Sequence, residues 1–558
     1  MRSNISLRAV LVLAAVAILG LAASPAGAAT LTWDANGTGA GQADGGGAWI
    51  GTGTNLWWTG TANQDWASGS DANFGNGGAG GAVTLASPTV VGLLTFNSFT
   101  GTYTLGTAGQ TITLNTGITK NSGSGAATII SPVTLGAAQS WTNKSTRLLT
   151  VGTGAVDNGG NLLTVGGTGN TTVTSAIGGA GGLTKTGTGT ILALSGVNTY
   201  SGPTTITDGL LIANSSAALG DGSATNTLIF GGGTMSGLQA SGSITSPSTR
   251  SVTLNNTGVI ITNYDVSIAG DISGASGLTQ NGSFGTLTLS GNNTYAGTTS
   301  IGGGSHRTNP GGVLVLNSAN ALPGGIGATG GTSALNFVNG VIGLGNGDFY
   351  RPLAAGIAGV TFQSNGTGGG WAAYGADRVV NIGGDLRSIT WATATTGFAG
   401  RVLRLGFHSA TNTVDFQNPI DMTNAARTVQ VDDGAADVDG KLSGNITGIA
   451  GGGLIKTGLG TLVLSGTNNY ADTTTVSAGT LRVNGNNTGA GAVTVSAGGA
   501  LGGIGAVTGA VTAAAGGSIK LFDGAVGTLT LGSSLTLNGT AAIESCKSNV
   551  HTLRLPIL

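Results

Sequence analysis

The chain has 558 residues, of which 108 are glycine and only 7% are charged, whereas soluble domains average about 25% charged residues. Its formal net charge is -1 and its lysines and arginines form no cluster, which argues against nucleic acid as a partner. Disordered chains are usually poor in β-branched residues, whereas this chain is rich in Thr, Val and Ile and can therefore build a packed core.

Residues 1–28 have the pattern of a secretory signal peptide. Arg2 and Arg8 precede an apolar run from Ala9 to Leu21, and small residues follow up to Ala28, where we expect cleavage. No later stretch reaches the roughly 18 apolar residues of a transmembrane helix. We therefore expect an exported chain, secreted or at the cell surface, with no transmembrane segment after cleavage. Cys546 is the only cysteine, which excludes an internal disulfide framework.

The segment 29–80 is rich in tryptophan and is expected to form an amino-terminal cap. Clustered tryptophans can close the open end of a stacked β-structure, whose first turn would otherwise expose core and unpaired strand. The alternative is that an exposed row, Trp49, Trp57, Trp58 and Trp66, stacks on sugar rings. The tryptophans of this segment are Trp33, Trp49, Trp57, Trp58 and Trp66.

One sequence pattern occurs three times within residues 81–544, at about 181–214, 276–317 and 452–484. The copies begin "GGLTKTGTGTILALSGVNTYSG", "SGLTQNGSFGTLTLSGNNTYAG" and "GGLIKTGLGTLVLSGTNNYADT". Each copy ends its apolar alternation at Ser-Gly and then places an Asn two residues before a Tyr. We interpret these residues as structural ladder and turn positions rather than as a row of binding groups. They are Asn198, Asn293, Asn468, Tyr200, Tyr295 and Tyr470.

The alternation within the copies predicts half-buried strands, because every second side chain then lies on one face. The first copy has one additional residue, so we expect a β-bulge near Ile191 that restores the register. The second copy carries an insertion, "SHRTNPGG" at Ser305–Gly312, which we expect to form a loop on the outside of the repeat.

Stacking of these short strands favours an all-β fold, a right-handed parallel β-helix or β-solenoid. Thr, Asn and Gly tolerate a position directly above an identical residue, and each backbone group finds a partner in the next coil. Sparse charge fits this arrangement, since like charges stacked about 4.8 Å apart would repel each other. We expect roughly 20–25 residues per coil and on the order of 20 coils in a rod about 100 Å long.

The densest acidic segment is "VDDGAADVDG", which contains Asp432, Asp433, Asp437 and Asp439. Carboxylate oxygens suit hard cations, so these residues are the calcium candidates, and no other cofactor is expected. A lyase-like site would add Lys441 or Arg427 as the base. The competing interpretation is that aspartate is simply a common turn residue in Gly-rich sequence.

Other catalytic signatures are missing from the sequence. His306, His408 and His551 lie far apart, and we interpret His306, beside Arg307 in the inserted turn, as an exposed loop residue. There is no H-E-x-x-H, G-x-S-x-G or P-loop motif. The sequence therefore predicts no catalytic residues.

The three copies resemble the autotransporter-associated β-strand repeat found in the passenger regions of bacterial surface and secreted proteins. This resemblance implies a β-helix passenger exported across the outer membrane, usually with a carboxy-terminal β-barrel or sorting signal. The tail 545–558, "SCKSNVHTLRLPIL", departs from that pattern after Glu544, and we expect a truncated or frame-shifted end there, with a short capping tail as the alternative.

The function predicted from these features is that of a non-enzymatic, exported structural and adhesive stalk. Its expected partners are cell-surface or matrix glycans or proteins. The alternative function is a carbohydrate-binding or polysaccharide-lyase-like β-helix that uses the acidic segment 432–439. Weak contacts repeated along a stiff rod would sum to avidity in the first case.

Overall fold

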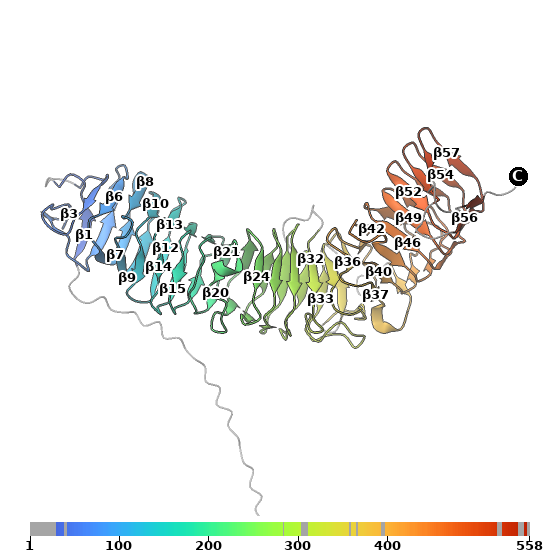
Figure 1. The fold of residues 1–558 in the computed structure, drawn as a ribbon, viewed down its shortest axis with the longest axis horizontal. Coiled ribbons are helices and arrows are strands. Elements are labelled where there is room, and N and C mark those ends of the chain that lie inside the picture. The colour runs from blue at the N-terminus through green and yellow to red at the C-terminus, as the bar shows by residue number, and fades with distance from the viewer. Residues whose placement is uncertain are drawn as a thin grey trace, which may run out of the picture.

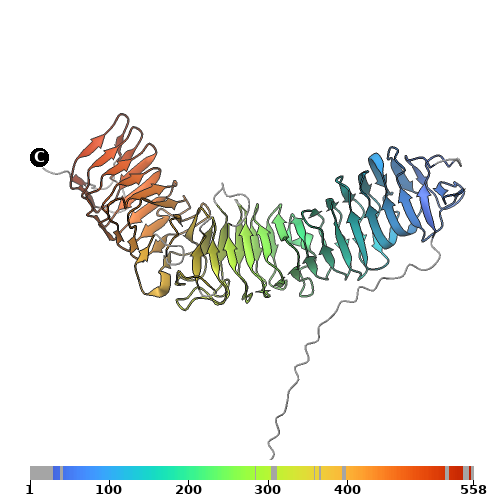
Figure 2. The same cartoon turned by 180° about the vertical axis from the view of Figure 1, so that it is seen from behind.

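The protein is a long, bent rod of stacked β-strands (Figures 1 and 2). The computed structural model describes residues 29–37, 42–282, 284–302, 311–356, 359–363, 366–391, 397–521, 527–544 and 552–554. Within these residues the helical elements are two short 3-10 turns, η1 (Ser216–Leu219) and η2 (Ile382–Gly384). The predicted signal peptide and most of the inserted segment, including His306, lie outside the described residues, as do Cys546 and His551.

Parallel strands from successive coils form long sheets that run along the rod, the largest with 16, 14, 13 and 8 strands. Leu183 lies beside Thr204, and Thr204 lies beside Leu228, so these two coils have the length of roughly 20–25 residues that the sequence predicts. The fold class expected from the sequence is therefore confirmed, and the chain forms about 20 turns. One continuous hydrophobic core extends from Leu31 to Leu531.

Each repeat copy spans two strands of one coil and the equivalent two strands of the next. In the first copy, β18 (Leu183–Lys185) pairs with β20 (Thr204–Ile206), and β19 (Ile191–Leu194) pairs with β21 (Gly209–Ala213). The second and third copies show the same parallel pairing. Their strands are β29 (Leu278–Asn281), β30 (Thr286–Leu289), β31 (Thr299–Ile301), β32 (Val313–Leu316), β45 (Leu454–Thr457), β46 (Thr461–Leu464), β48 (Thr474–Val476) and β49 (Gly479–Val483).

The β-bulge expected near Ile191 is wrong. Strand β19 keeps an unbroken register with its neighbours on both sides, and Leu192 and Leu194 face the core. The additional residue lies in the turn before the strand. Thr190 is buried in this turn, and its Oγ1 accepts a hydrogen bond from Lys185 Nζ. Register shifts between described strands occur instead near Gly92 and Gly125.

The amino-terminal end of the rod carries the antiparallel strand ladders of the described residues. Strand β1 (Thr30–Trp33) pairs in parallel with β5 (Asp71–Phe74), but on its other edge it pairs antiparallel with β3 (Trp57–Trp58). Strand β3 continues antiparallel to β4 (Asn63–Gln64). This hairpin covers the edge that the first coil would otherwise expose, which is the usual protection of a terminal strand.

The rod bends in its carboxy-terminal part (Figure 1). Gly370 pairs with Arg404 of the next coil, whereas Val476 pairs with Val495, so the coil at the bend contains many more residues than the coil further along the rod. The 14-stranded sheet ends with β35 (Val360–Phe362), and the 8-stranded sheet begins with β37 (Arg378–Val380). The bend therefore coincides with the replacement of one sheet by another around an enlarged coil.

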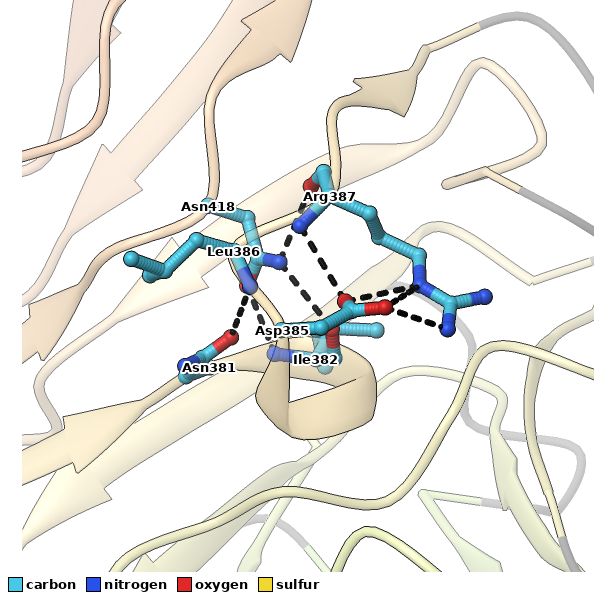
Figure 3. Close-up of polar contacts among 6 residues, drawn as sticks. All are labelled: Asn381, Ile382, Asp385, Leu386, Arg387 and Asn418. Carbon is cyan, nitrogen blue, oxygen red and sulfur yellow. Dashed lines mark hydrogen bonds and ion pairs between the residues drawn. The ribbon is translucent and has the colours of Figure 1, made fainter.

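Polar contacts hold the turn η2 in this wide coil (Figure 3). Asn418 of the following coil accepts a hydrogen bond from the Ile382 amide at 2.6 Å and donates to the Arg387 carbonyl at 3.0 Å. Asp385 and Arg387 form an exposed ion pair at 2.7 Å. Leu386 has a φ of 54°, and its amide donates to Asn381 Oδ1.

Beyond the bend, the rod contains seven strands of the 13-stranded sheet and the strands of the 8-stranded sheet, together with those of a 3-stranded and a 5-stranded sheet. The first set is β39 (Val402–Leu405), β42 (Arg427–Val431), β45, β48, β51 (Val493–Val495), β54 (Val511–Ala513) and β57 (Leu535–Leu537). The second set is β37, β40 (Val414–Phe416), β43 (Gly440–Leu442), β46, β49, β52 (Gly499–Gly502), β55 (Ser518–Lys520) and β58 (Ala542–Glu544).

Strand β59 (Thr552–Arg554), in the segment expected to be an atypical tail, pairs in parallel with β56 (Thr528–Leu531) and so continues the ladder. Among the described residues, no helix is long and apolar enough to cross a membrane.

Candidate functional site

The tryptophan cluster packs inside the amino-terminal cap. Trp57 lies at its centre, with ring centroids 5.4 Å from Trp33, 4.6 Å from Trp49 and 4.6 Å from Trp66. These four side chains are buried, whereas Trp58 is half-buried. Trp49, Trp57 and Trp66 therefore offer no free ring face to a sugar, which corrects the alternative of an exposed stacking row and agrees with a cap.

The repeated Asn is a clamp between coils in the first two copies, whereas Asn468 of the third copy accepts from the Ile446 amide but donates to Gly466 of its own turn. Asn198 Oδ1 accepts a hydrogen bond from the Ile177 amide of the preceding coil at 2.8 Å, and its Nδ2 donates to the Ala218 carbonyl of the following coil at 2.6 Å. Asn293 makes the equivalent pair of bonds with Ile272 and Ala321. Because both asparagines are buried, they satisfy backbone groups that water cannot reach.

The repeated Tyr is equally internal. The hydroxyls of Tyr200, Tyr295 and Tyr470 each bond to a threonine hydroxyl four residues later, at 2.6, 2.6 and 2.5 Å. Burial raises the pKa of Tyr200 and Tyr295 to about 12, so both stay neutral. These buried positions agree with the structural interpretation of the repeated residues.

Two lysines of the repeats, Lys185 and Lys456, are buried, which was not predicted from the sequence motifs. Lys185 Nζ donates to Thr190 Oγ1 and to turn carbonyls, and Lys456 Nζ donates to the carbonyls of Gly458 at 2.6 Å and Ala478 at 2.9 Å. Burial lowers the pKa of each to about 8. The alternation of the strand indicates that these lysines are buried, because each stands two residues after an inward-facing leucine, Leu183 or Leu454.

The acidic segment forms one loop between β42 and β43, and three of its four carboxylates bond within the protein. Asp432 forms an ion pair with the buried Arg404 at 2.8 Å, and Asp437 forms one with Arg482 at 2.9 Å. Asp439 accepts hydrogen bonds from the amides of Gly434 and Thr461, and burial raises its pKa. Asp433 is exposed.

The structure does not gather these aspartates around one point. Within the described residues, no three His, Cys, Asp or Glu side chains are grouped as metal ligands. Of the two bases considered, Lys441 forms an ion pair with Asp415 at 3.1 Å, and Arg427 begins β42 at the end of the strand opposite the loop. The calcium hypothesis stays a prediction, and no geometry here favours the lyase alternative.

A shallow depression lies beside this loop, at the corner between the 13-stranded and the 8-stranded sheet. Its first part, about 330 Å³, is lined by Phe407, His408, Asp432, Asp433, Gly458 and Leu459. Its second part, about 380 Å³, begins at the same Leu459 and follows stacked turns and strand starts to Glu544. We call the two parts together the corner groove. The second part is lined by Leu459, Gly479, Thr480, Gly498, Gly499, Ala500, Gly516, Gly517, Ser518, Lys520, Thr540, Ala542 and Glu544.

The corner groove was not foreseen, although the sequence has a signal for one of its residues. Leu459 stands in the turn "TGLG" of the third copy, where the first copy has Thr188. Because this leucine lies in a glycine turn, outside the strand in which alternate residues face the core, its side chain is 73% exposed. His408, also exposed, packs its ring on buried Phe407 at a centroid distance of 4.3 Å.

Comparison with known proteins agrees with the fold. The passenger-associated transport repeat matches residues 183–213, 278–305 and 454–483. The chain is 29% identical over 474 residues to the adhesin BmaC autotransporter of Brucella suis biovar 1 (strain 1330), and this alignment covers 81% of the chain. It covers 11% of the relative, so the chain spans about a ninth of that protein's length. No solved structure matches the chain.

The fold and the matches together support the class that the resemblance implied: the chain is a parallel β-helix similar to autotransporter passengers. It carries three copies of the passenger-associated transport repeat, and in each the repeated Asn and Tyr are buried and the Tyr hydroxyl bonds to a threonine four residues later.

Proposed function

We propose that the protein is an exported adhesive stalk, which holds binding surfaces away from the cell and has no enzymatic activity. The observation that carries this proposal is the uninterrupted β-helix with its passenger repeats, aligned over most of its length with an autotransporter adhesin. At about 4.8 Å per coil, some 20 coils give a rod about 100 Å long.

The chemistry of the described surface supports adhesion rather than catalysis. The conspicuous titratable groups are occupied within the fold, such as Lys185 and Lys456 on turn carbonyls and Asp439 on backbone amides. A general acid or base must instead reach a substrate. A stiff rod with many weak contacts gains affinity by multivalency, which requires only that several contacts form together.

Bead adhesion tests the proposal. Latex beads coated at high density with the chain from Ala29 onward should adhere to cultured epithelial cells or to immobilised matrix proteins. Beads coated at equal density with a protein of similar size and charge are the control. Adhesion should fall steeply when the coating density is lowered, as multivalent contact requires. Adhesion no better than the control on all surfaces would contradict the proposed function.

Export is a separate part of the proposal. The arginines and apolar run of residues 1–28 support passage through the inner membrane. Mass spectrometry of the protein recovered from outside the cytoplasm should find Ala29 as its first residue. Recovery only in the cytoplasm with residues 1–28 intact would contradict export.

A further inference from the structure

The corner groove consists of two depressions that adjoin at Leu459 and together follow the axis of the rod. Its two parts share Leu459, and the groove passes seven successive coils from Phe407 to Thr540. With a spacing of about 4.8 Å between coils, it extends about 29 Å along the rod. A groove of this shape fits an extended polymer better than a compact small molecule.

The lining combines apolar faces with hydrogen-bonding groups. At one end, the exposed His408 ring on Phe407 and the side chain of Leu459 offer apolar contact beside the carboxylates of Asp432 and Asp433. Along the second part, Thr480 and Thr540 supply hydroxyls among glycines and alanines. Sugar rings present the matching pattern, since each ring has apolar C–H faces and a rim of hydroxyls.

The charges of the groove are balanced from within, which favours an uncharged ligand. Asp432 is paired with Arg404 at 2.8 Å, and Lys520 lies 3.9 Å from Glu544. Asp433 adds a single negative charge at the rim. A strongly charged polymer gains most from an uncompensated field of opposite sign, and the groove offers little of either sign.

An extended peptide fits less well, because its usual mode is to add a strand to an open sheet edge. The strands that flank the groove, from β42 to β54 and from β43 to β55, already pair with a neighbour on both sides. Their backbone groups are therefore not available to a visiting strand. A glycan needs no such edge.

We propose that the corner groove binds an extended, uncharged, hydroxyl-rich glycan chain. This inference rests on the proposed adhesive function and gives it a ligand class. Leu459 and the ring of His408 contact the sugar faces, the exposed Asp433 carboxylate accepts hydrogen bonds from the sugar hydroxyls, and the hydroxyls of Thr480 and Thr540 donate or accept further ones. The spacing of the coils is comparable with the length of one pyranose unit, so successive sugars can meet successive turns.

Calorimetric titration tests the proposal with defined probes: cellohexaose, chitohexaose, maltohexaose and, as a peptide, hexalysine. At least one neutral hexasaccharide should bind the chain from Ala29 onward with one site. Leu459→Asp and His408→Ala should each weaken that binding at least tenfold. Both side chains are exposed, so the variants should keep the wild-type circular dichroism. Ile449→Asp is the matched control, because Ile449 is 68% exposed in a turn that does not line the groove.

Several results would overturn the proposal. These are binding of none of the hexasaccharides, unchanged binding in Leu459→Asp, or binding of hexalysine alone, which would assign the groove to a basic peptide. Bead adhesion separates this inference from the proposed function. Equal adhesion of wild-type and Leu459→Asp beads to glycan-bearing cells counts against the groove and leaves the adhesive function standing. Hexasaccharide binding without any bead adhesion counts against the adhesive function and supports the groove.

Discussion

Replacement of Asn198 by leucine tests how one coil is held to the next. The Asn198 side chain is 2% exposed and bonds to the Ile177 amide on one side and the Ala218 carbonyl on the other. Leucine has the same branching at Cγ, although it is larger, and it cannot form hydrogen bonds, so both backbone groups lose their partner inside the protein. Each unsatisfied buried group costs about 1–3 kcal/mol, which gives about 2–6 kcal/mol for the pair.

Local hydrogen exchange is the appropriate assay, because each coil of a solenoid contacts only its neighbours and opens with its own free energy. The slowest amides in coils 177–218 should lose protection by at least about 30-fold, which corresponds to about 2 kcal/mol. Amides near Val493 should be unaffected. Asn214→Leu is the control, since Asn214 is exposed and donates only one bond, to the Ser195 carbonyl.

The clamp explanation is refuted if Asn198→Leu keeps wild-type protection in these coils. It is also refuted if Asn214→Leu loses as much protection as Asn198→Leu, because then the loss would not depend on buried backbone partners. Asn293→Leu should reproduce the effect around Ile272 and Ala321, where the same two bonds occur.

Two further predictions concern the core. Burial lowers the pKa of Lys456 in the folded protein to about 8. Above that pH the unfolded state binds more protons than the folded state, so the free energy of unfolding should rise with pH. Between pH 8 and pH 9.5 this one lysine should contribute up to about 2 kcal/mol to the rise. Urea titrations at pH 7.5, 8.5 and 9.5 should show this rise in the wild type but not in Lys456→Met. The same dependence of the free energy of unfolding on pH in the two proteins would contradict the prediction. Trp57→Ala should destabilise the cap by about 3–5 kcal/mol, because it removes the central ring of the cluster. Thermolysin, which cleaves before apolar residues, should then cut within residues 42–80 before the rest of the rod, whereas cleavage unchanged from the wild type would show that the cluster does not hold the cap.

The repeats were the most informative part of the sequence. Their alternation placed Leu287 and Leu289 on the inward face, and both are fully buried. The coil length was predicted from the usual length of solenoid repeats, and Leu183 and Thr204, which stand one coil apart, agree with it. The bulge near Ile191 was mispredicted because a register count along one strand ignores that a turn can take up an additional residue, as Thr190 does.

The candidate sites were less accessible to sequence reasoning. Clustered tryptophans can face inward or outward, and only the packing around Trp57 decides between a cap and a sugar-stacking row. The aspartates from 432 to 439 are adjacent in sequence, but Arg404 and Arg482 from other coils hold two of them. The corner groove consists of turns that lie one coil apart in the chain, so no local pattern marks it.

The sequence by itself therefore determined the stacking: short alternating strands, glycine turns and few charges can bury a core only by repetition along an axis. Tertiary structure alone decided the rest. The bend lies where one sheet replaces another beside the coil between Gly370 and Arg404, and the groove depends on which turns lie above one another. The physical reason is that alternation specifies which face of a strand is buried, whereas the outer surface forms from residues of different coils, and their alignment depends on the length of every turn between them.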